Sequence, residues 1–167
     1  AVQGFGNVGS FFGTVAQAEQ PHWQLKATTD SSGGIYLQNG ELDAEKLAVY
    51  KKEGGRLVDY SKGSEISNDD LTGLEVDVLV LAALGDAITE RTMMDVKAQI
   101  VLELANGPVN EVAFDYLSGR GVVVVPDILA NAGGVIVSYL EWQQNTQAEQ
   151  WDEATVNKKL DTYLVTA

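Results

Sequence analysis

Residues 1–9 read AVQGFGNVG, and the interpretation of the whole chain starts from this stretch. It contains a G-x-G-x-x-G pattern whose glycines are Gly4, Gly6 and Gly9. In a strand–turn–helix unit, the first glycine permits a tight turn and the second lets the backbone approach a pyrophosphate. The third lets the helix lie close to the sheet, and the N–H groups at the helix start face the phosphates. The stretch therefore predicts a dinucleotide site.

The residues that follow strengthen this prediction, since a chain with 17 glycines can produce the pattern by chance. Apolar residues recur at helical spacing after Asn7 and predict a helix: Val8, Phe11, Phe12, Val15 and Ala16. Residues 24–29 then suggest a strand that ends at Asp30, 21 residues after Gly9. The ribose-binding carboxylate of this motif is expected near that distance. The alternative to a dinucleotide site is a plain glycine turn, with Asp30 as an ordinary turn or helix-cap residue. The helix, the strand and the aspartate follow the glycines at the spacing of the dinucleotide motif, which disfavours this alternative.

Composition indicates one globular domain and excludes several kinds of site. The 167 residues are 45% hydrophobic and 21% charged, which is ordinary for a soluble domain. The absence of cysteine excludes disulfides and thiolate metal ligands, and the single histidine, His22, reads as a surface loop residue, so we expect no metal. A net charge of −13 disfavours nucleic acid and anionic membranes as partners.

No apolar run approaches a membrane span, and no signal peptide is visible, so we expect a cytoplasmic protein. Because Ala1 lies inside a motif, we also expect that the natural N-terminus precedes it.

Strands and helices alternate along the chain. Residues 76–83, 100–103 and 122–125 are apolar enough for buried parallel strands. Asp43 and Asn110 are suited to cap two helices, and Leu42 with Leu47 can form a hydrophobic staple at the first. Residues 56–60 suggest a short strand, and residues 67–71 a helical turn. This alternation predicts an α/β Rossmann-like fold, a doubly wound, mostly parallel sheet with helices on both faces.

The last long helix predicted, about residues 131–145, has a polar side. Asn131, Val135, Ser138 and Trp142 are spaced to share one face. A core-facing helix rarely begins such a stripe with asparagine and continues it with serine, so we expect this helix to face a cleft. A further amphipathic helix is expected near the end of the chain, at residues 151–166.

Four segments together resemble the glutamate dehydrogenase branch of the amino-acid dehydrogenases: GFGNVG, TDSSGGIY, ELANGP and PDILANAGGVIVSYLEWQQN. The resemblance covers about residues 1–145, and PDxxANAGG followed by VSYxEW is its most specific part. It implies that residues 1–167 form a single dinucleotide-binding domain whose parent protein has a separate amino-terminal half. Enzymes of this family oxidise L-glutamate reversibly to 2-oxoglutarate and ammonia and pass a hydride to NAD or NADP.

The resemblance also implies a role for each matching residue. Pyrophosphate would be held by Gly4, Gly6, Asn7, Val8 and Gly9, and the adenosine ribose by Asp30 and Ser31. Ala82 and Ala83 would line the ribose and adenine path, and Asn106 and Asn131 would hold the nicotinamide end. Val135 and Ser138 would meet the substrate side chain, with Ser138 donating to the distal carboxylate of glutamate.

We expect NAD rather than NADP as the preferred cofactor, because Asp30 suits a free 2′-hydroxyl and residues 31–40 contain no Lys or Arg. The resemblance does not decide this choice, because family members that use NADP also have an aspartate at this position. The family's catalytic lysine and aspartate belong to the amino-terminal half, so no catalytic residue is expected here. The chain should bind cofactor without turning over glutamate, and the parent should be a homo-oligomer, a hexamer by resemblance.

Three alternatives stay open from the sequence. The chain could serve a leucine, valine or phenylalanine dehydrogenase, although a serine hydroxyl at position 138 suits a carboxylate better than an aliphatic side chain. It could be a non-catalytic nucleotide-sensing module, or a Rossmann-like domain for another adenine ligand such as S-adenosylmethionine.

Overall fold

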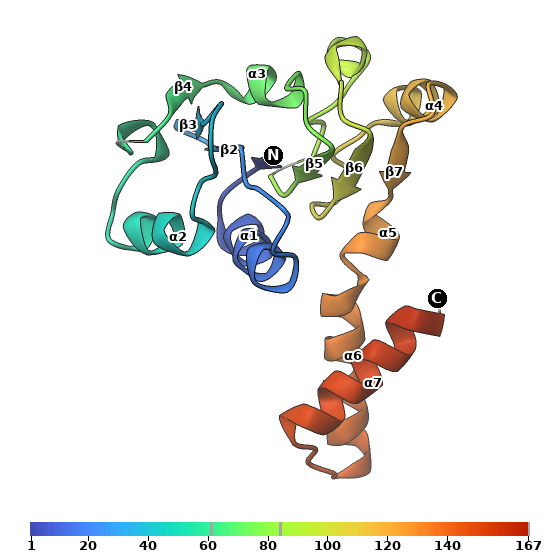
Figure 1. Cartoon of the computed structure of the whole chain (residues 1–167). Helices are drawn as coiled ribbons and strands as arrows, with labels where there is room; N and C mark the ends of the chain where they lie inside the picture. The colour runs from blue at the N-terminus through green and yellow to red at the C-terminus, as the bar shows by residue number, and fades with distance from the viewer. Residues whose placement is uncertain (61, 84, 167) are drawn as a thin grey trace.

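One seven-stranded sheet forms the centre of the molecule. The structure is a computed structural model, and it describes residues 1–60, 62–83 and 85–166. The strand order is β4-β3-β2-β1-β5-β6-β7 (Figure 1). The strands are β1 (Val2–Gln3), β2 (Ala27–Asp30), β3 (Gly33–Tyr36), β4 (Ser64–Ile66), β5 (Val78–Leu81), β6 (Ile100–Glu103) and β7 (Val123–Val125). Strands β2, β1, β5, β6 and β7 run parallel, and β3 and β4 continue the sheet antiparallel. The mostly parallel sheet predicted from the sequence is confirmed.

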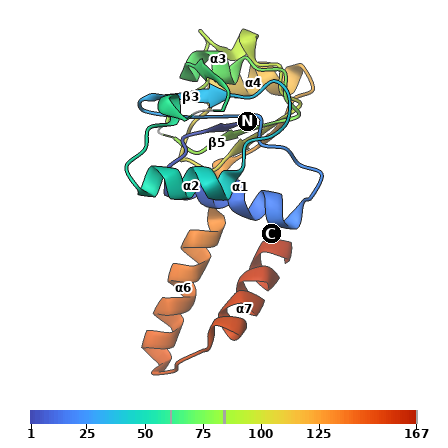
Figure 2. The ribbon, with the colours of Figure 1, turned by 60° about the vertical axis from the view of Figure 1, so that its left-hand side comes forward.

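Helices cover both faces of this sheet. The helices are α1 (Asn7–Glu19), α2 (Ala44–Lys52), α3 (Asn68–Thr72), α4 (Glu111–Gly119), α5 (Asp127–Ala130), α6 (Ala132–Gln147) and α7 (Glu153–Thr166), with short 3₁₀ turns η1 (Leu57–Asp59) and η2 (Met93–Asp95). Helices α1 and α2 lie on one face, and α3 and α4 lie on the other (Figures 1 and 2). Each face encloses its own apolar cluster. The doubly wound architecture is therefore confirmed as well.

Strand β5 illustrates how the sequence produces this arrangement. Leu79 and Leu81 are buried in the cluster beneath α3 and α4, while Val80 is buried in the cluster beneath α1 and α2. Alternate side chains of a strand point to opposite faces, so a strand buried on both sides must be apolar throughout.

The strand order creates a switch point between β1 and β5. From β1 the chain crosses through α1 to β2 on one side, and β5 lies on the other side of β1. The carboxyl ends of the two strands stay joined, because the Ala82 N–H donates to the Gln3 carbonyl at 2.8 Å. Ligands of such sheets bind outside the carboxyl ends at the switch point.

Helices α6 and α7 form a hairpin that leaves the sheet beyond β7 and α5 (Figures 1 and 2). Of the described residues in the two helices, Leu140 is the one that is buried. An aromatic contact joins the two helices, since Tyr163 of α7 meets Tyr139 of α6 edge-on at 6.2 Å, and Tyr139 also stacks on Trp142 of its own helix at 5.9 Å. Within the described ranges, no helix has the length and apolar content to cross a bilayer.

Two local features differ from the sequence prediction. Residues 56–60 do not form a strand but turn tightly, with i to i+3 hydrogen bonds from Asp59 to Arg56 and from Tyr60 to Leu57. The strand of this region is β4, which begins at Ser64, four residues after Tyr60. Its Ser64 and Glu65 are exposed and only Ile66 is buried, so this edge strand carries little apolar pattern.

Helix α1 is present as predicted, but only part of its apolar stripe faces the core, where Phe12 packs against the apolar cluster. Val8, Phe11 and Val15 are 54%, 72% and 41% exposed, whereas Gly9 and Gly13 are buried. A Cβ at Gly13 would lie 3.2 Å from the Cβ of Ala44. The helix therefore approaches β1 and α2 through its glycines, and part of its apolar side stays exposed.

Candidate functional site

The turn that joins β1 to α1 can be made only with glycine at two positions. Gly4 has a φ of +88°, and a Cβ there would lie 2.6 Å from the carbonyl carbon of Ala82 and the nitrogen of Ala83. A Cβ at Gly9 would lie 2.1 Å from the Gly4 carbonyl oxygen. Both contacts are with backbone atoms, which cannot rotate away. These two glycines therefore fix the start of α1 against the ends of β1 and β5.

Gly6 differs from both, because a Cβ at Gly6 would have no atom within 4 Å. It is the N-cap residue of α1, and no side chain caps this end of the helix. Gly6, Asn7 and Val8 are all exposed. Backbone N–H groups in the first turn of a helix have no partner within the helix, and with the helix dipole they attract anions. The start of α1 thus offers an open cradle of N–H groups.

Three other helices of the sheet region have capped N-termini. Asp43, Ser67 and Asn110 accept hydrogen bonds from the first turns of α2, α3 and α4, respectively. The start of α1 has no side-chain cap, a feature that it shares with α5 and α6, and it is the uncapped start that lies against the ends of β1 and β5.

Asp30 ends β2 beside this cradle. Its Oδ1 accepts hydrogen bonds from the Ser32 N–H at 2.8 Å and the Ser32 hydroxyl at 2.7 Å, and its Oδ2 pairs with the ammonium of Lys51. Burial alone would raise the pKa of Asp30, but the hydrogen bonds from Lys51 and Ser32 outweigh it and hold the pKa below its usual value. Asp30 is thus a charged carboxylate, and its neighbour Ser31 is exposed.

A second set of polar residues lies at the ends of β6 and β7. The Asn131 side-chain amide donates to Asn106 Oδ1 at 2.7 Å. Asp127 connects the same two loops, since its Oδ2 accepts from the Gly107 N–H at 2.8 Å and its own N–H donates to Glu103 Oε2 at 2.9 Å. These bonds join the loop after β6 to the start of α5 and position the two asparagines.

Glu103 is buried and has an unusual environment. Burial raises the pKa of its carboxyl group, the hydrogen bond from the Asp127 N–H lowers it, and the nearby Asp127 charge raises it again; the net pKa lies above the usual value.

Two of the predicted residues lie apart from these groups. Val135, 73% exposed, and Ser138, also exposed, follow along α6, which leads away from the sheet (Figure 1). Among the hydrogen bonds of the described residues, none joins either of them to the glycine turn.

Two hollows on the described part of the chain bear on the choice of a ligand site. The larger, about 490 Å³, lies at the amino ends of β1 and β5, and none of the predicted site residues lines it. An open groove of about 440 Å³ runs along the start of α1 between Asn7, Val8, Phe11 and Leu104. Because ligands of doubly wound sheets bind at the carboxyl ends of the strands, the groove is the relevant one.

Sequence reasoning missed Lys51 and Glu103, and it missed Asn68, whose side-chain amide donates to the Asp30 carbonyl at 3.2 Å. Lys51 lies in the last turn of α2 and reaches the end of β2 only because β3 runs antiparallel and α2 returns to the carboxyl edge. Lys51 lies beyond residues 31–40, the segment in which the sequence offers no basic residue for a 2′-phosphate. Asn68 and Glu103 carry no local signal of their contacts.

Comparison with known proteins agrees with this geometry. The family described as Glutamate/Leucine/Phenylalanine/Valine dehydrogenase matches residues 1–167. A glutamate dehydrogenase from Thermotoga maritima is 50% identical over 164 residues, which are 98% of this chain and 39% of that protein. An NADP-specific glutamate dehydrogenase A1 from Halobacterium salinarum is 46% identical across 100% of this chain and 40% of its own length. The chain thus spans about two fifths of the length of these relatives.

Solved structures give the same result. A hetero-hexameric glutamate dehydrogenase from Thermus thermophilus, in a Leu-bound form, superposes with a TM-score of 0.84 at 35% identity, covering 99% of this chain and 38% of that one. An L-tryptophan dehydrogenase from Nostoc punctiforme has a TM-score of 0.66 at 26% identity, covering 98% of this chain and 42% of that one.

Proposed function

The chain belongs to the glutamate, leucine, phenylalanine and valine dehydrogenase family, and we propose that it is the NAD(P)-binding domain of a glutamate dehydrogenase. One observation carries the proposal: the uncapped start of α1 lies at the switch point of the sheet, beside the Asp30 carboxylate. The N–H groups at the start of α1 can bind a pyrophosphate, and the Asp30 carboxylate can accept a hydrogen bond from a ribose hydroxyl.

The residues present fit a dinucleotide. The turn from Gly4 to Gly9 would hold the pyrophosphate, with the open space over Gly6 allowing close approach. Asp30 and Ser31 would bind the adenosine ribose, and Ala82 and Ala83 would line the path next to Gly4. The hydrogen-bonded pair of Asn106 and Asn131 would hold the nicotinamide end. When bound, the cofactor supplies the hydride chemistry.

Asp30 favours NAD over NADP, because a carboxylate accepts hydrogen bonds from a free 2′-hydroxyl and repels a phosphate there. The NADP-specific relative from Halobacterium salinarum supports NADP as a second cofactor that this fold can accept. We propose NAD as the preferred cofactor and NADP as the weaker one.

L-glutamate is the proposed substrate of the longer protein. Water, the oxidised dinucleotide and glutamate would give 2-oxoglutarate, ammonium, the reduced dinucleotide and one proton, with the hydride passing from the α-carbon to the dinucleotide. Ser138 would donate to the distal carboxylate, and Val135 would pack beside it. The family's catalytic lysine and aspartate have no counterpart in these residues, so the 167-residue chain would bind cofactor without turnover. A homo-hexamer is the proposed assembly, and the hetero-hexameric glutamate dehydrogenase from Thermus thermophilus supports the number of subunits.

Calorimetric titration of the 167-residue chain with NAD and with NADP tests the cofactor proposal. Saturable one-site binding of either supports it, and tighter binding of NAD supports the assignment of Asp30. Tighter binding of NADP contradicts the cofactor order, and binding of neither contradicts the proposed site.

A second measurement tests the substrate. Ser138→Ala, placed in a longer protein that contains this chain, should raise the KM for glutamate about tenfold or more, since an unpaired carboxylate costs about 1.5 kcal/mol or more. In the 167-residue chain the same change should leave the fold and cofactor binding intact, because Ser138 is exposed on α6. Unchanged glutamate kinetics would contradict the role of Ser138.

A further inference from the structure

Lys51 makes two contacts at once. Its ammonium pairs with Asp30 Oδ2 and donates to the carbonyl oxygen of Phe5 at 2.9 Å. Phe5 lies within the G-x-G-x-x-G turn, and Asp30 ends β2. A single side chain from α2 therefore ties together the segments proposed for the pyrophosphate and for the ribose.

The pairing changes the charge that a ligand meets. An unpaired aspartate at the end of β2 would present one negative charge to the 2′ position of the ribose. Here the ammonium of Lys51 lies against that carboxylate, with the two side chains 24% and 17% exposed, so the pair is neutral as a whole. The repulsion by which such an aspartate rejects a 2′-phosphate is correspondingly reduced.

The ammonium also retains a donor. A lysine ammonium carries three N–H groups and accepts no hydrogen bond. Within the described ranges, Lys51 uses two of them, on Asp30 and on Phe5. The third can donate to an oxygen of a ligand at this edge of the sheet.

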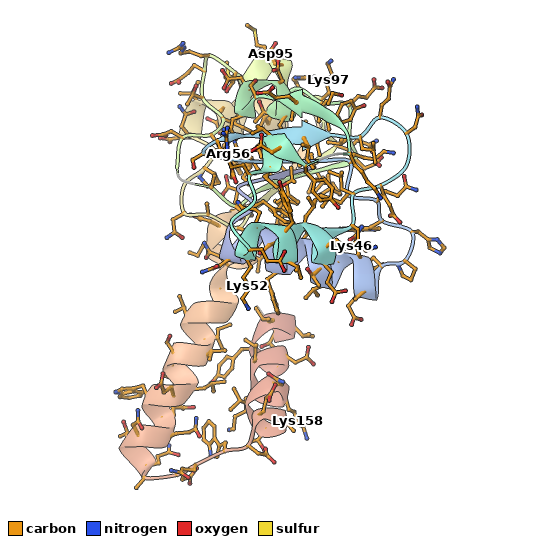
Figure 3. The ribbon with its side chains drawn as sticks, turned by 90° about the vertical axis from the view of Figure 1, so that its left-hand side faces the viewer. Lys46, Lys52, Arg56, Asp95, Lys97 and Lys158 are labelled. Carbon is orange, nitrogen blue, oxygen red and sulfur yellow. The ribbon has the colours of Figure 1, made fainter. Side chains whose placement is uncertain are left out.

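The surroundings single out Lys51 among the basic residues. The chain has 24 acidic against 11 basic residues, so its overall field repels a phosphate. Nearby, Lys46 pairs with Asp43 and Arg56 with Asp59. Lys52 is exposed and points away from the sheet (Figure 3). Lys51 is the basic residue that contacts the ribose carboxylate.

We infer that Lys51 sets the cofactor choice of this site, by neutralising Asp30 and offering its remaining N–H so that the 2′-phosphate of NADP is accepted beside NAD. The inference rests on the proposed dinucleotide site and assigns to it a residue outside the G-x-G-x-x-G and Asp30 motifs. Lys51 does not touch the reacting atoms of the cofactor, so it acts on specificity alone.

Titration of Lys51→Met with NAD and with NADP tests the inference. Loss of the ammonium leaves Asp30 uncompensated, so NADP binding should weaken about tenfold or more, which corresponds to about 1.4 kcal/mol, while NAD binding should change less than about threefold. Lys52→Met is the matched control, since it removes the same charge from the next residue of the same helix and should change neither affinity. Lys51→Arg keeps the charge and should keep the wild-type ratio.

Three outcomes overturn the inference. An equal loss for both cofactors would make Lys51 a clamp of the turn with no part in specificity, and unchanged affinities for both would leave it without a role in binding. Wild-type protein that binds neither dinucleotide would overturn the proposed function itself, whereas wild-type binding with an unchanged ratio in Lys51→Met overturns the inference alone. If Lys51→Met fails to fold by circular dichroism, Lys51→Gln, which keeps donors towards Asp30 and Phe5, should show the same selective loss of NADP.

Discussion

Helices α1 and α2 pack side by side on one face of the sheet, yet their ends are built differently. Helix α2 has Asp43 as a cap, Glu45 in its first turn, and Lys51 and Lys52 in its last turn, all of which complement the helix dipole. Helix α1 has glycine at its N-cap, no acidic residue in its first turn and no basic residue in its last turn. One helix is stabilised by its own termini, and the other by close packing, which leaves its N-terminus open to an anion.

The largest effect expected from this difference is at Gly9, on which the packing of α1 depends. Gly9→Ala should destabilise the protein by about 2 kcal/mol or more, because the new Cβ would overlap the Gly4 carbonyl, at a cost above the ~1 kcal/mol that alanine gains in helix propensity. Urea unfolding measures the loss. Gly119→Ala, in the last turn of α4 with open space around it, is the control and should not destabilise. Equal stability of both variants would show that α1 can shift away from β1.

Gly6→Ala should affect binding more than stability. A Cβ at Gly6 meets no protein atom, and its φ of −87° suits alanine, so stability should fall by no more than about 1 kcal/mol, the cost of alanine at an N-cap. The methyl group would occupy the space over the turn, and titration should show binding of NAD weakened about tenfold or more, or about 1.4 kcal/mol. Wild-type affinity in this variant would place the pyrophosphate elsewhere.

The two helices also show which features can be predicted from a sequence. The cap and staple of α2 lie within six residues, from Leu42 to Leu47, and local chemistry determines them; both leucines are buried as predicted. The glycine turn was recognisable for the same reason. The Lys51 contact with Asp30 depends instead on the direction of β3 and the length of α2, which no local pattern encodes. Strand β4 was missed because an edge strand with one buried side chain carries almost no periodicity.

Removing the cap of α2 should have a smaller effect, confined to stability. Asp43 accepts from the Lys46 N–H at 2.9 Å, so Asp43→Ala should cost about 1 kcal/mol in urea unfolding. Titration with NAD should be unchanged, because Asp43 lies at the start of α2, at the opposite end of the helix from Lys51. A change in affinity would mean that the position of α2 itself controls the site.

The smallest effect concerns the Asp30–Lys51 pair, which joins the end of β2 to α2, and it depends on pH. The folded-state pKa of Asp30 lies below its usual value of 3.8, so the carboxylate stabilises the folded protein above pH 3.8, and this contribution is lost as the pH falls through the folded-state value. Asp30→Asn should therefore be less stable than wild type by about 1 kcal/mol at pH 7, a typical magnitude for a partly exposed ion pair.

The difference should shrink towards zero at pH 3, as measured by urea unfolding at pH 7, 5 and 3. Glu103, whose raised pKa makes the folded state less stable as the pH rises, titrates in both proteins and so cancels in the comparison. A difference that stays constant from pH 7 to pH 3 would contradict the lowered pKa of Asp30 and mean that neither Lys51 nor Ser32 favours its charged form in the folded protein. In that case Lys51 would hold the start of α1 mainly through the Phe5 carbonyl, and its influence on a 2′-phosphate would come from its own charge alone.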